Sequence, residues 1–346
     1  MASKLAVQLW QGAAQDASPV VVHRMTMHAR EPVPLEEIQA ARERLDGIAI
    51  RTPLVRLNVD GAPAEIYLKL ENLQPIGSFK LRGAGNAMAI ATPEQLSRGV
   101  YTASAGNMAQ GIAWCARRIG VPCTVIVPDH APATKLSAIE RLGGVVVKVA
   151  FDEWWQVLMT HQYAGMEGLF IHPVSAPAVM AGNGTIGLEI IDDLPDVDAV
   201  VVPFGGGGLA CGIASALRAV APHVPVYAAE VETASPLAQS LAANAPQQVH
   251  YTPTFVDGIG GKGVLAEMWP LARELLHGSL VVSLDAIASA VRTLAERNRV
   301  IAEGAGAASV AAALTGGAGG GKIVCIVSGG NIDVAKLAKI LVGEMP

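Results

Sequence analysis

The chain has 346 residues, a length typical of two domains, and 51% of them are hydrophobic while only 16% are charged. This composition excludes a disordered chain, because it can bury a large core. The net charge of −5 without a basic stripe argues against a nucleic-acid partner, and no apolar run reaches the roughly 20 residues of a membrane helix. Few aromatic residues and 37 glycines favour parallel Val- and Ile-rich strands joined by tight turns, so we predict an α/β fold.

The cysteines and the N-terminus indicate the setting of the protein. No two cysteines form a CxxC pair, and each lies in an apolar stretch, which predicts buried reduced thiols and a cytoplasmic location. Residues 1–30 contain no clean apolar segment with a cleavage site, so we predict a loosely held N-terminal arm rather than a signal peptide. The cysteines are Cys115, Cys123, Cys211 and Cys325.

A helix is predicted over residues 34–45, where apolar residues recur at helical spacing. Two strands follow at 52–57 and 65–71, with a turn at Asp60-Gly61 between them. From residue 99 onward strands and helices alternate, which predicts parallel pairing with helices on both faces. The predicted strands are 99–102, 123–127, 145–149, 199–202, 226–229, 280–283 and 322–327. The predicted helices are 107–119, 133–142, 176–193, 209–220, 285–302 and 332–341.

A first glycine turn, residues 77–80 (Gly-Ser-Phe-Lys), follows the second predicted strand. Ser78 is a natural helix N-cap, which would place Lys80 in the first turn of a helix. The positive end of a helix disfavours a protonated amine, so Lys80 can have a lowered pKa and act as a nucleophile or base. The alternative is a solvated surface lysine.

A second turn contains four consecutive glycines, residues 205–208, between a predicted strand and a predicted helix. Such a turn can aim several backbone N–H groups at one anion, so it predicts a phosphate-binding loop; the alternative is a tight turn without a ligand. Gly205, Gly207 and Ala210 also fit the pattern G-x-G-x-x-A of dinucleotide-binding proteins. Since Glu230 ends the next strand, a dinucleotide-binding oxidoreductase remains a further alternative.

Two more segments join a strand end to a helix start. Residues 328–331 (Ser-Gly-Gly-Asn) place a hydroxyl where α/β sheets bind ligands, and residues 102–110 offer small polar groups and N–H groups suited to a carboxylate. Each could also be an ordinary capping turn. Together with an activated lysine and a phosphate-binding loop, they favour pyridoxal-phosphate chemistry, in which a lysine binds the cofactor aldehyde.

Residues 69–84 (KLENLQPIGSFKLRGA) resemble the cofactor-lysine segment of the threonine dehydratase and serine racemase family of fold type II pyridoxal-phosphate enzymes. The motifs follow the family order from about residue 35 to residue 341. The resemblance implies two open, twisted, mostly parallel sheets flanked by helices, as in the tryptophan synthase β subunit. It also implies a larger cofactor-binding domain of residues 31–89 and 180–346, with a smaller mobile domain, 90–179, inserted in it.

The resemblance implies a role for each residue of the site. Lys80 would form the internal aldimine, and Phe79 would pack near the cofactor ring. Asn107 would bond the phenolic oxygen, and Ser328 would bond the pyridine nitrogen. Gly258 would line the site with its backbone. The residues implied to hold the phosphate are Gly205, Gly206, Gly207, Gly208 and Leu209. The residues implied to contact the substrate are Ser104, Ala105, Gly106, Asn107 and Met108.

The implied reaction is β-elimination from a β-hydroxy amino acid such as L-threonine or L-serine, giving a 2-oxo acid and ammonia. Lys80 would remove the α-proton, and the neutral hydroxyl of Ser328 would favour prompt elimination over transamination. Ala105 stands where racemases of the family have a serine, so we favour a dehydratase over a serine racemase. Met108 replaces the usual histidine, which leaves phenylserine, hydroxyaspartate and hydroxyectoine-derived compounds as alternative substrates.

Metal and partners complete the prediction. Some family members bind a divalent cation at positions that match Glu230 and Ala234, but the third position is Pro236, which has no ligating side chain. We therefore predict no metal. Family members are commonly dimers or tetramers, so we expect a homo-oligomer whose other partner is a small amino-acid substrate, with neither nucleic acid nor membrane.

Overall fold

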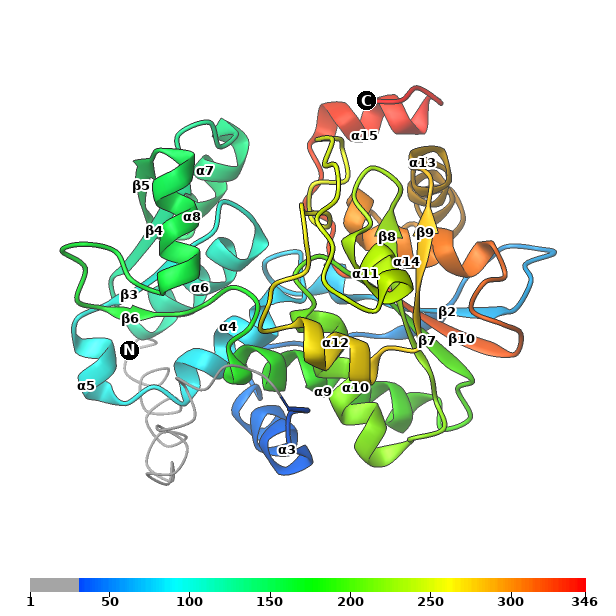
Figure 1. Ribbon diagram of the computed structural model, residues 1–346, viewed down its shortest axis with the longest axis horizontal. Helices are drawn as coiled ribbons and strands as arrows, with labels where there is room; N and C mark the ends of the chain where they lie inside the picture. The colour runs from blue at the N-terminus through cyan, green and yellow to red at the C-terminus, as the bar shows by residue number, and fades with distance from the viewer. Residues whose placement is uncertain (1–30) are drawn as a thin grey trace.

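The computed structural model describes residues 31–346, so the predicted arm over residues 1–30 lies outside the described residues. The strands form two sheets, which lie in separate lobes and carry helices on both faces (Figure 1). This arrangement confirms the predicted α/β fold with two mostly parallel sheets. Within residues 31–346, no helix has the length and apolar character needed to cross a bilayer.

The larger sheet has six strands in the order β1-β2-β10-β7-β8-β9. β1 is antiparallel to β2, and all other pairs are parallel. In β7, Val200 and Val202 pack on one face while Val201 packs on the other, so the strand is buried on both sides. The strands are β1 (Leu54–Arg56), β2 (Glu65–Lys69), β7 (Ala199–Pro203), β8 (Val226–Val231), β9 (Gly278–Val282) and β10 (Lys322–Ile326).

The smaller sheet has four parallel strands in the order β5-β4-β3-β6. They are β3 (Val100–Ala103), β4 (Cys123–Pro128), β5 (Val145–Val149) and β6 (Leu169–Phe170). Because this sheet uses only residues from 100 to 170, it supports our proposal that residues 90–179 form an inserted domain.

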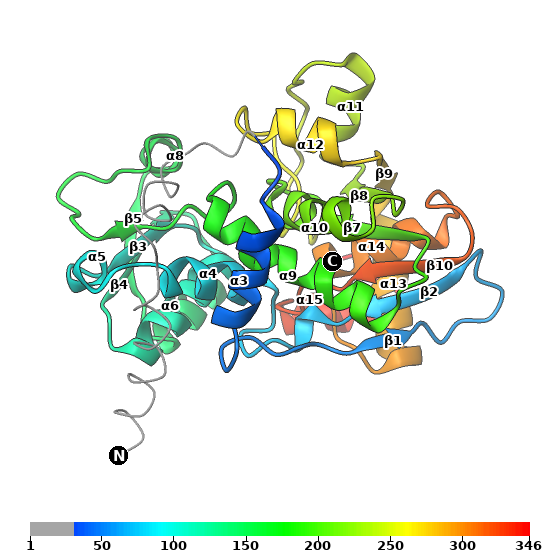
Figure 2. The same ribbon diagram turned by 90° about the horizontal axis from the view of Figure 1, so that it is seen from below.

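The helices fall into two groups and a pair that lies between the lobes (Figure 2). The helices of the smaller lobe are α5 (Pro93–Ser97), α6 (Asn107–Ile119), α7 (Ala133–Arg141) and α8 (Phe151–Thr160). Those of the larger lobe are α3 (Leu35–Arg44), α10 (Gly208–Val220), α11 (Pro236–Ala243), α12 (Trp269–Leu275), α13 (Leu284–Thr293), α14 (Gly304–Leu314) and α15 (Val334–Leu341), with short helical segments η1 (Glu71–Leu73) and η2 (Leu294–Asn298). The pair between the lobes is α4 (Lys80–Ala89) and α9 (Pro177–Asp193).

Helix α14 was not among the predicted helices. Its sequence is rich in glycine and alanine, and glycine has a low intrinsic helix propensity. The helix is nevertheless almost fully buried, and its glycines permit close packing: a Cβ at Gly306 would lie 2.3 Å from the carbonyl oxygen of Gly329. Tertiary packing therefore overrides propensity here, and it brings the start of α14 against the turn that follows β10.

Helix α9 packs directly against both α4 and α10. A Cβ at Gly182 of α9 would lie 2.4 Å from the carbonyl oxygen of Arg82 in α4. A Cβ at Gly212 of α10 would lie 2.5 Å from the carbonyl oxygen of Met180 in α9. Only residues without a side chain permit these approaches. One helix therefore sets the spacing between the helix that begins at Lys80 and the helix that follows the glycine loop.

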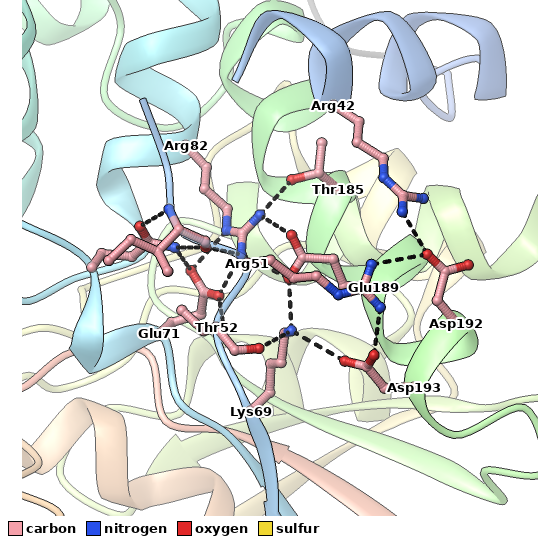
Figure 3. A network of polar contacts seen from close by, with 12 residues as sticks. Arg42, Arg51, Thr52, Lys69, Glu71, Arg82, Thr185, Glu189, Asp192 and Asp193 are labelled. Carbon is pink, nitrogen blue, oxygen red and sulfur yellow. Dashed lines mark hydrogen bonds and ion pairs between the residues drawn. The ribbon is translucent and has the colours of Figure 1, made fainter. Parts of the chain in front are cut away.

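A network of buried charges fastens α4 to β2 and α9 (Figure 3). Arg82 donates to Glu71 through Nε and Nη2, both at 2.8 Å, and to Glu189 through Nη1 at 2.7 Å and Nη2 at 2.9 Å. Lys69 Nζ lies 2.6 Å from Glu189 Oε2 and donates to the Thr52 carbonyl oxygen at 2.6 Å. Each buried charge thus has an opposite partner, which offsets the cost of removing it from water.

Candidate active site

Lys80 is the first residue of α4, one of the two helices that lie between the lobes (Figure 2). Its Nζ donates to the carbonyl oxygen of Pro173 at 2.9 Å and lies 5.1 Å from the centre of the Phe79 ring. Burial of the amine lowers the pKa of Lys80 to about 8, and the nearby charge of Glu303 opposes that shift. The neutral form, which can act as a nucleophile or base, is therefore far more populated near physiological pH than in a lysine with the ordinary pKa.

The start of α4 differs in detail from the predicted cap. The N-cap residue is Phe79, which already has helical dihedral angles and no capping side chain. Ser78 Oγ instead accepts the Lys80 N–H at 3.4 Å, two residues along the chain. The helix thus begins one residue later than a Ser78 cap implies, and Lys80 still lies in its first turn.

The four glycines 205–208 connect β7 to α10 and have the geometry of an anion-binding loop. Gly207 is the N-cap of α10, with φ +93°, and no side chain caps the helix. Residues 206 and 208 must also lack side chains, because their Cβ atoms would lie 2.7 Å from the Val174 side chain and 2.4 Å from its carbonyl oxygen. An uncapped helix N-terminus with adjacent flexible N–H groups suits a phosphate. Leu209, predicted beside it, packs its side chain into the core.

The turn after β10 lies directly beside the lysine segment. Ser328 is almost fully buried, and its carbonyl oxygen accepts the Phe79 N–H at 3.0 Å. Gly330 N donates to the Gly77 carbonyl oxygen at 2.9 Å, and Ser78 pairs with Gly329 in an isolated antiparallel bridge. Two turns separated by about 250 residues in sequence therefore form one backbone unit that carries both Lys80 and Ser328.

Asn107 begins α6 in the smaller lobe and reaches across to the larger lobe. Its Nδ2 donates to Glu303 Oε1 at 2.9 Å, and its Oδ1 accepts from Asn331 Nδ2 at 2.8 Å. In the preceding loop, Ser104 Oγ accepts the Gly106 N–H at 3.3 Å. Met108 is 1% exposed and belongs to the hydrophobic core cluster of the smaller lobe, against which Ala105 of this loop also packs.

Glu303 is a residue of this site that the sequence analysis did not single out. It precedes α14, is 7% exposed, and lies near Asn107 and Lys80. Burial raises the pKa of Glu303 to about 7, with the Asp257 carboxylate adding to the effect and the Lys135 ammonium opposing it. The only sign of Glu303 in the sequence was its position as an isolated glutamate before a tract rich in glycine and alanine. Its partner Asn107 is 196 residues away, so sequence proximity could not reveal the contact.

The remaining glycines close the site around Lys80. A Cβ at Gly258 would lie 3.5 Å from Glu303 Oε1, and a Cβ at Gly205 would lie 3.4 Å from the Gly258 carbonyl oxygen. Val174, which packs on the glycine loop, follows the proline that accepts the Lys80 hydrogen bond. A continuous series of contacts thus links Lys80 to the glycine loop 205–208, to the turn that contains Ser328 and to the loop that contains Ser104 and Asn107. This donor set fits pyridoxal phosphate, with Lys80 for its aldehyde and the loop for its phosphate.

Glu230, on which the dinucleotide alternative depends, is already engaged. Its carboxylate accepts hydrogen bonds from Leu237 N at 2.9 Å, Ala238 N at 2.8 Å and Ser279 Oγ at 2.6 Å. Burial raises the pKa of this carboxyl group, and these donors oppose the shift. Because Glu230 is 1% exposed and already accepts three hydrogen bonds from the protein, the geometry does not favour a contact with a ribose hydroxyl, as an oxidoreductase would need. Within the described residues, no group of three or more His, Cys, Asp or Glu side chains could hold a metal ion.

Comparison with known proteins agrees with this chemistry. Residues 45–329 match the family described as "Pyridoxal-phosphate dependent enzyme". The chain is 40% identical over 314 residues to an L-threonine ammonia-lyase from Thermotoga maritima, a match that covers 89% of this chain and 78% of that protein. It is 37% identical to the L-threonine dehydratase catabolic TdcB of Escherichia coli K12, over 89% of this chain and 96% of that one. The structure of maize serine racemase superposes with a TM-score of 0.83 at 32% identity, covering 90% and 98% of the two chains. The chain therefore belongs to the family of pyridoxal-phosphate-dependent enzymes.

Proposed function

We propose that this protein is an ammonia-lyase that dehydrates and deaminates L-threonine or L-serine to a 2-oxo acid and ammonia. The observation that carries the proposal is Lys80, whose amine has a pKa near 8 and lies among the anion-binding loop, the Ser328 turn and the Asn107 loop. The names of the relatives, L-threonine ammonia-lyase and L-threonine dehydratase, support the substrate class.

Each part of the site has a task in this reaction. Bound pyridoxal phosphate withdraws electrons from the α-carbon of the amino acid. Lys80 would hold the cofactor aldehyde, and its neutral amine would accept the α-proton at Nζ. The N–H groups of residues 205–208 would stabilise the phosphate, and the loop that contains Ser104 and Asn107 would bind the substrate carboxylate. Ser328 offers a hydroxyl that carries no charge, which leaves the pyridine nitrogen free of a forced positive charge.

A serine racemase is the second candidate, because the maize serine racemase shares this fold at 32% identity. Racemisation requires a second acid or base on the opposite face of the substrate. Ala105 occupies the loop position that would supply it, and a methyl group cannot transfer a proton. We therefore expect elimination to exceed interconversion of L- and D-serine, and a comparison of the two rates in one preparation decides between them.

Bulkier β-hydroxy amino acids rank behind threonine and serine. The replacement of a histidine by Met108 left phenylserine and similar compounds open as substrates. The Met108 side chain is buried among core residues, and the relatives named for L-threonine favour the smaller substrates. A panel of β-hydroxy amino acids, assayed for 2-oxo acid release with magnesium and with a chelator, tests both the substrate and the prediction of no metal. The proposal fails if no member of the panel releases a 2-oxo acid.

We also infer a homo-oligomer in a cytoplasmic setting. α15 exposes the apolar side chains of Val334 and Leu341, and Val342 directly after it is also exposed; a second subunit could cover them. The four cysteines are free and buried, which suits a reducing compartment. Light scattering of the purified protein measures the assembly, and a monomeric mass at micromolar concentration would refute the first inference.

A further inference from the structure

A short turn between β6 and α9, residues 172–175, contacts both the lysine and the glycine loop. Its Pro173 carbonyl oxygen accepts the hydrogen bond from Lys80 Nζ at 2.9 Å. Its Val174 lies so close to the loop that only glycine fits at positions 206 and 208. The conformation of this turn therefore determines where the lysine amine is held and how the anion-binding loop is covered.

The ring of His172 organises this turn from within. Its Nδ1 lies 3.2 Å from Val174 N, 2.9 Å from Ser175 N and 2.9 Å from Ser175 Oγ. The two backbone N–H groups can only donate, so Nδ1 is the acceptor and the ring proton resides on Nε2. The ring is 5% exposed and packs against the rings of His161, at 4.8 Å, and Phe170, at 6.2 Å between centres.

His172 does not exchange protons in the physiological range. Burial, together with the nearby charges of His161 and Lys80, lowers the pKa of His172 to about 3. The imidazole is thus permanently neutral, although it lies near the reactive amine. Because Nδ1 is occupied by hydrogen bonds from residues 174 and 175, the structure favours a geometric contribution over an acid or base role.

We infer that His172 is a positioning residue for Lys80: its Nδ1 folds residues 173–175 so that the Pro173 carbonyl oxygen holds Nζ and Val174 covers the glycine loop. This inference rests on the proposed function. A neutral amine that donates one N–H to Pro173 directs its lone pair away from that oxygen. The turn therefore aims the lone pair that accepts the α-proton, and errors of about 1 Å in such geometry cost roughly a hundredfold in rate.

Two amide substitutions separate positioning from mere bulk. In His172→Asn the side-chain oxygen is two bonds from Cβ, as Nδ1 is, so it can still accept from Val174 N and Ser175 N. In His172→Gln the same amide lies one bond further out and cannot. His172→Leu removes the acceptor entirely, and His223→Leu, at an exposed histidine before β8, is the matched control.

We expect His172→Asn to keep kcat within about fivefold of the wild type, while His172→Gln and His172→Leu lower kcat about 10- to 100-fold with little change in KM. Because proton abstraction becomes slower in the last two variants, the kinetic isotope effect on kcat with α-deuterated substrate should rise in them and not in His172→Asn. The inference is overturned if all three variants behave alike, or if kcat and the isotope effect stay unchanged in His172→Leu. If His172→Leu does not fold, the comparison of Asn with Gln still decides.

A second measurement does not depend on turnover. The rate at which Lys80 of the apoenzyme captures pyridoxal phosphate is followed by the visible absorption of the lysine-bound cofactor. The same order is expected, with wild type and His172→Asn fast and the other two variants slow; equal capture rates in all would contradict the inference. If the wild type captures the cofactor but releases no 2-oxo acid from any β-hydroxy amino acid, the proposed function fails, whereas the capture rates still test the turn.

Discussion

The first turn of α4 contributes to two groups of ionisable side chains, one around Arg82 and one around Lys80. The two groups differ in how their charges are paired. Arg82 lies between two carboxylates. Burial tends to lower the pKa of Arg82, but Glu71 and Glu189 raise it. Burial likewise tends to raise the pKa of Glu71, but Arg82 lowers it. Two residues earlier, burial shifts the pKa of Lys80 down to about 8, and across the site it shifts that of Glu303 up to about 7.

The difference lies in the number of partners. Arg82 has two carboxylates within hydrogen-bonding distance, whereas Lys80 donates to one carbonyl oxygen and Glu303 accepts from one neutral amide. A buried group with opposite charges beside it stays charged and holds the backbone in place. A buried group with only one uncharged partner has a pKa shifted toward 7, so it can exchange a proton near neutral pH. The first cluster therefore holds the helix in place, and we propose that the second, which includes Lys80 at the start of that helix, carries out the chemistry. The tests below challenge that division, beginning with the largest effect.

Removal of the reactive amine gives the largest effect. Lys80→Ala should lower 2-oxo acid release at least about a thousandfold and abolish the visible absorption of lysine-bound cofactor, because both depend on Nζ. Its thermal stability should not fall, since the substitution removes an amine whose burial is unfavourable. The exposed Lys262→Ala serves as the control. Turnover and absorption at wild-type levels in Lys80→Ala would show that the reactive lysine is misassigned.

Glu189→Ala tests the fully paired cluster. Both Arg82 and Lys69 lose a partner, and leaving buried charges unpaired should lower the free energy of unfolding by about 3–5 kcal/mol. Asp192→Ala, which removes an exposed partner of Arg42 and Arg51, should cost less than about 1 kcal/mol. Urea denaturation measures both. Equal losses in the two variants would mean that burial of the network does not matter.

Glu303→Gln tests the sparsely paired cluster through pH. The raised pKa means that the folded protein binds more protons than the unfolded chain between about pH 4.5 and 7, so stability falls as pH rises through this window. The loss is on the order of 3 kcal/mol for a shift of this size. The glutamine variant lacks this loss, so it should match the wild type below pH 4.5 and exceed its stability above pH 7. A difference that is constant with pH would contradict the shift; exposed Glu94→Gln controls for charge removal.

The ion pair between Lys135 of α7 and Asp257 should have the smallest effect. Its atoms are 2.8 Å apart and join the two lobes, but both side chains are partly exposed. A double-mutant cycle of Lys135→Met and Asp257→Asn should give a coupling of less than about 1 kcal/mol that weakens with added salt. A coupling of several kcal/mol, unchanged by salt, would place this pair with the buried network instead.

Local patterns in the sequence were sufficient for much of this architecture. The valine-rich strand and the glycine run after it predicted both β7 and the helix that follows, α10, because each depends on neighbouring residues. Helix α14 escaped prediction since its stability comes from packing rather than propensity. Glu303 and His172 escaped for a related reason: Glu303 meets Asn107 across 196 residues, and His172 acts through a turn whose neighbours are distant in sequence. The burial of Met108 in the core was likewise not evident from its place at the start of α6.

The central position of β10 has a consequence for how the chain is made. This strand lies between β2 and β7, yet it is the last strand in the sequence, some 250 residues after β2. On the ribosome, the smaller sheet is complete when residue 170 has emerged, whereas the larger sheet has an open seam until residue 326 is available. The edges of β2 and β7 stay unpaired for that interval, and unpaired edges invite aggregation. Nascent chains stalled before residue 322 should therefore be the species that chaperones retain.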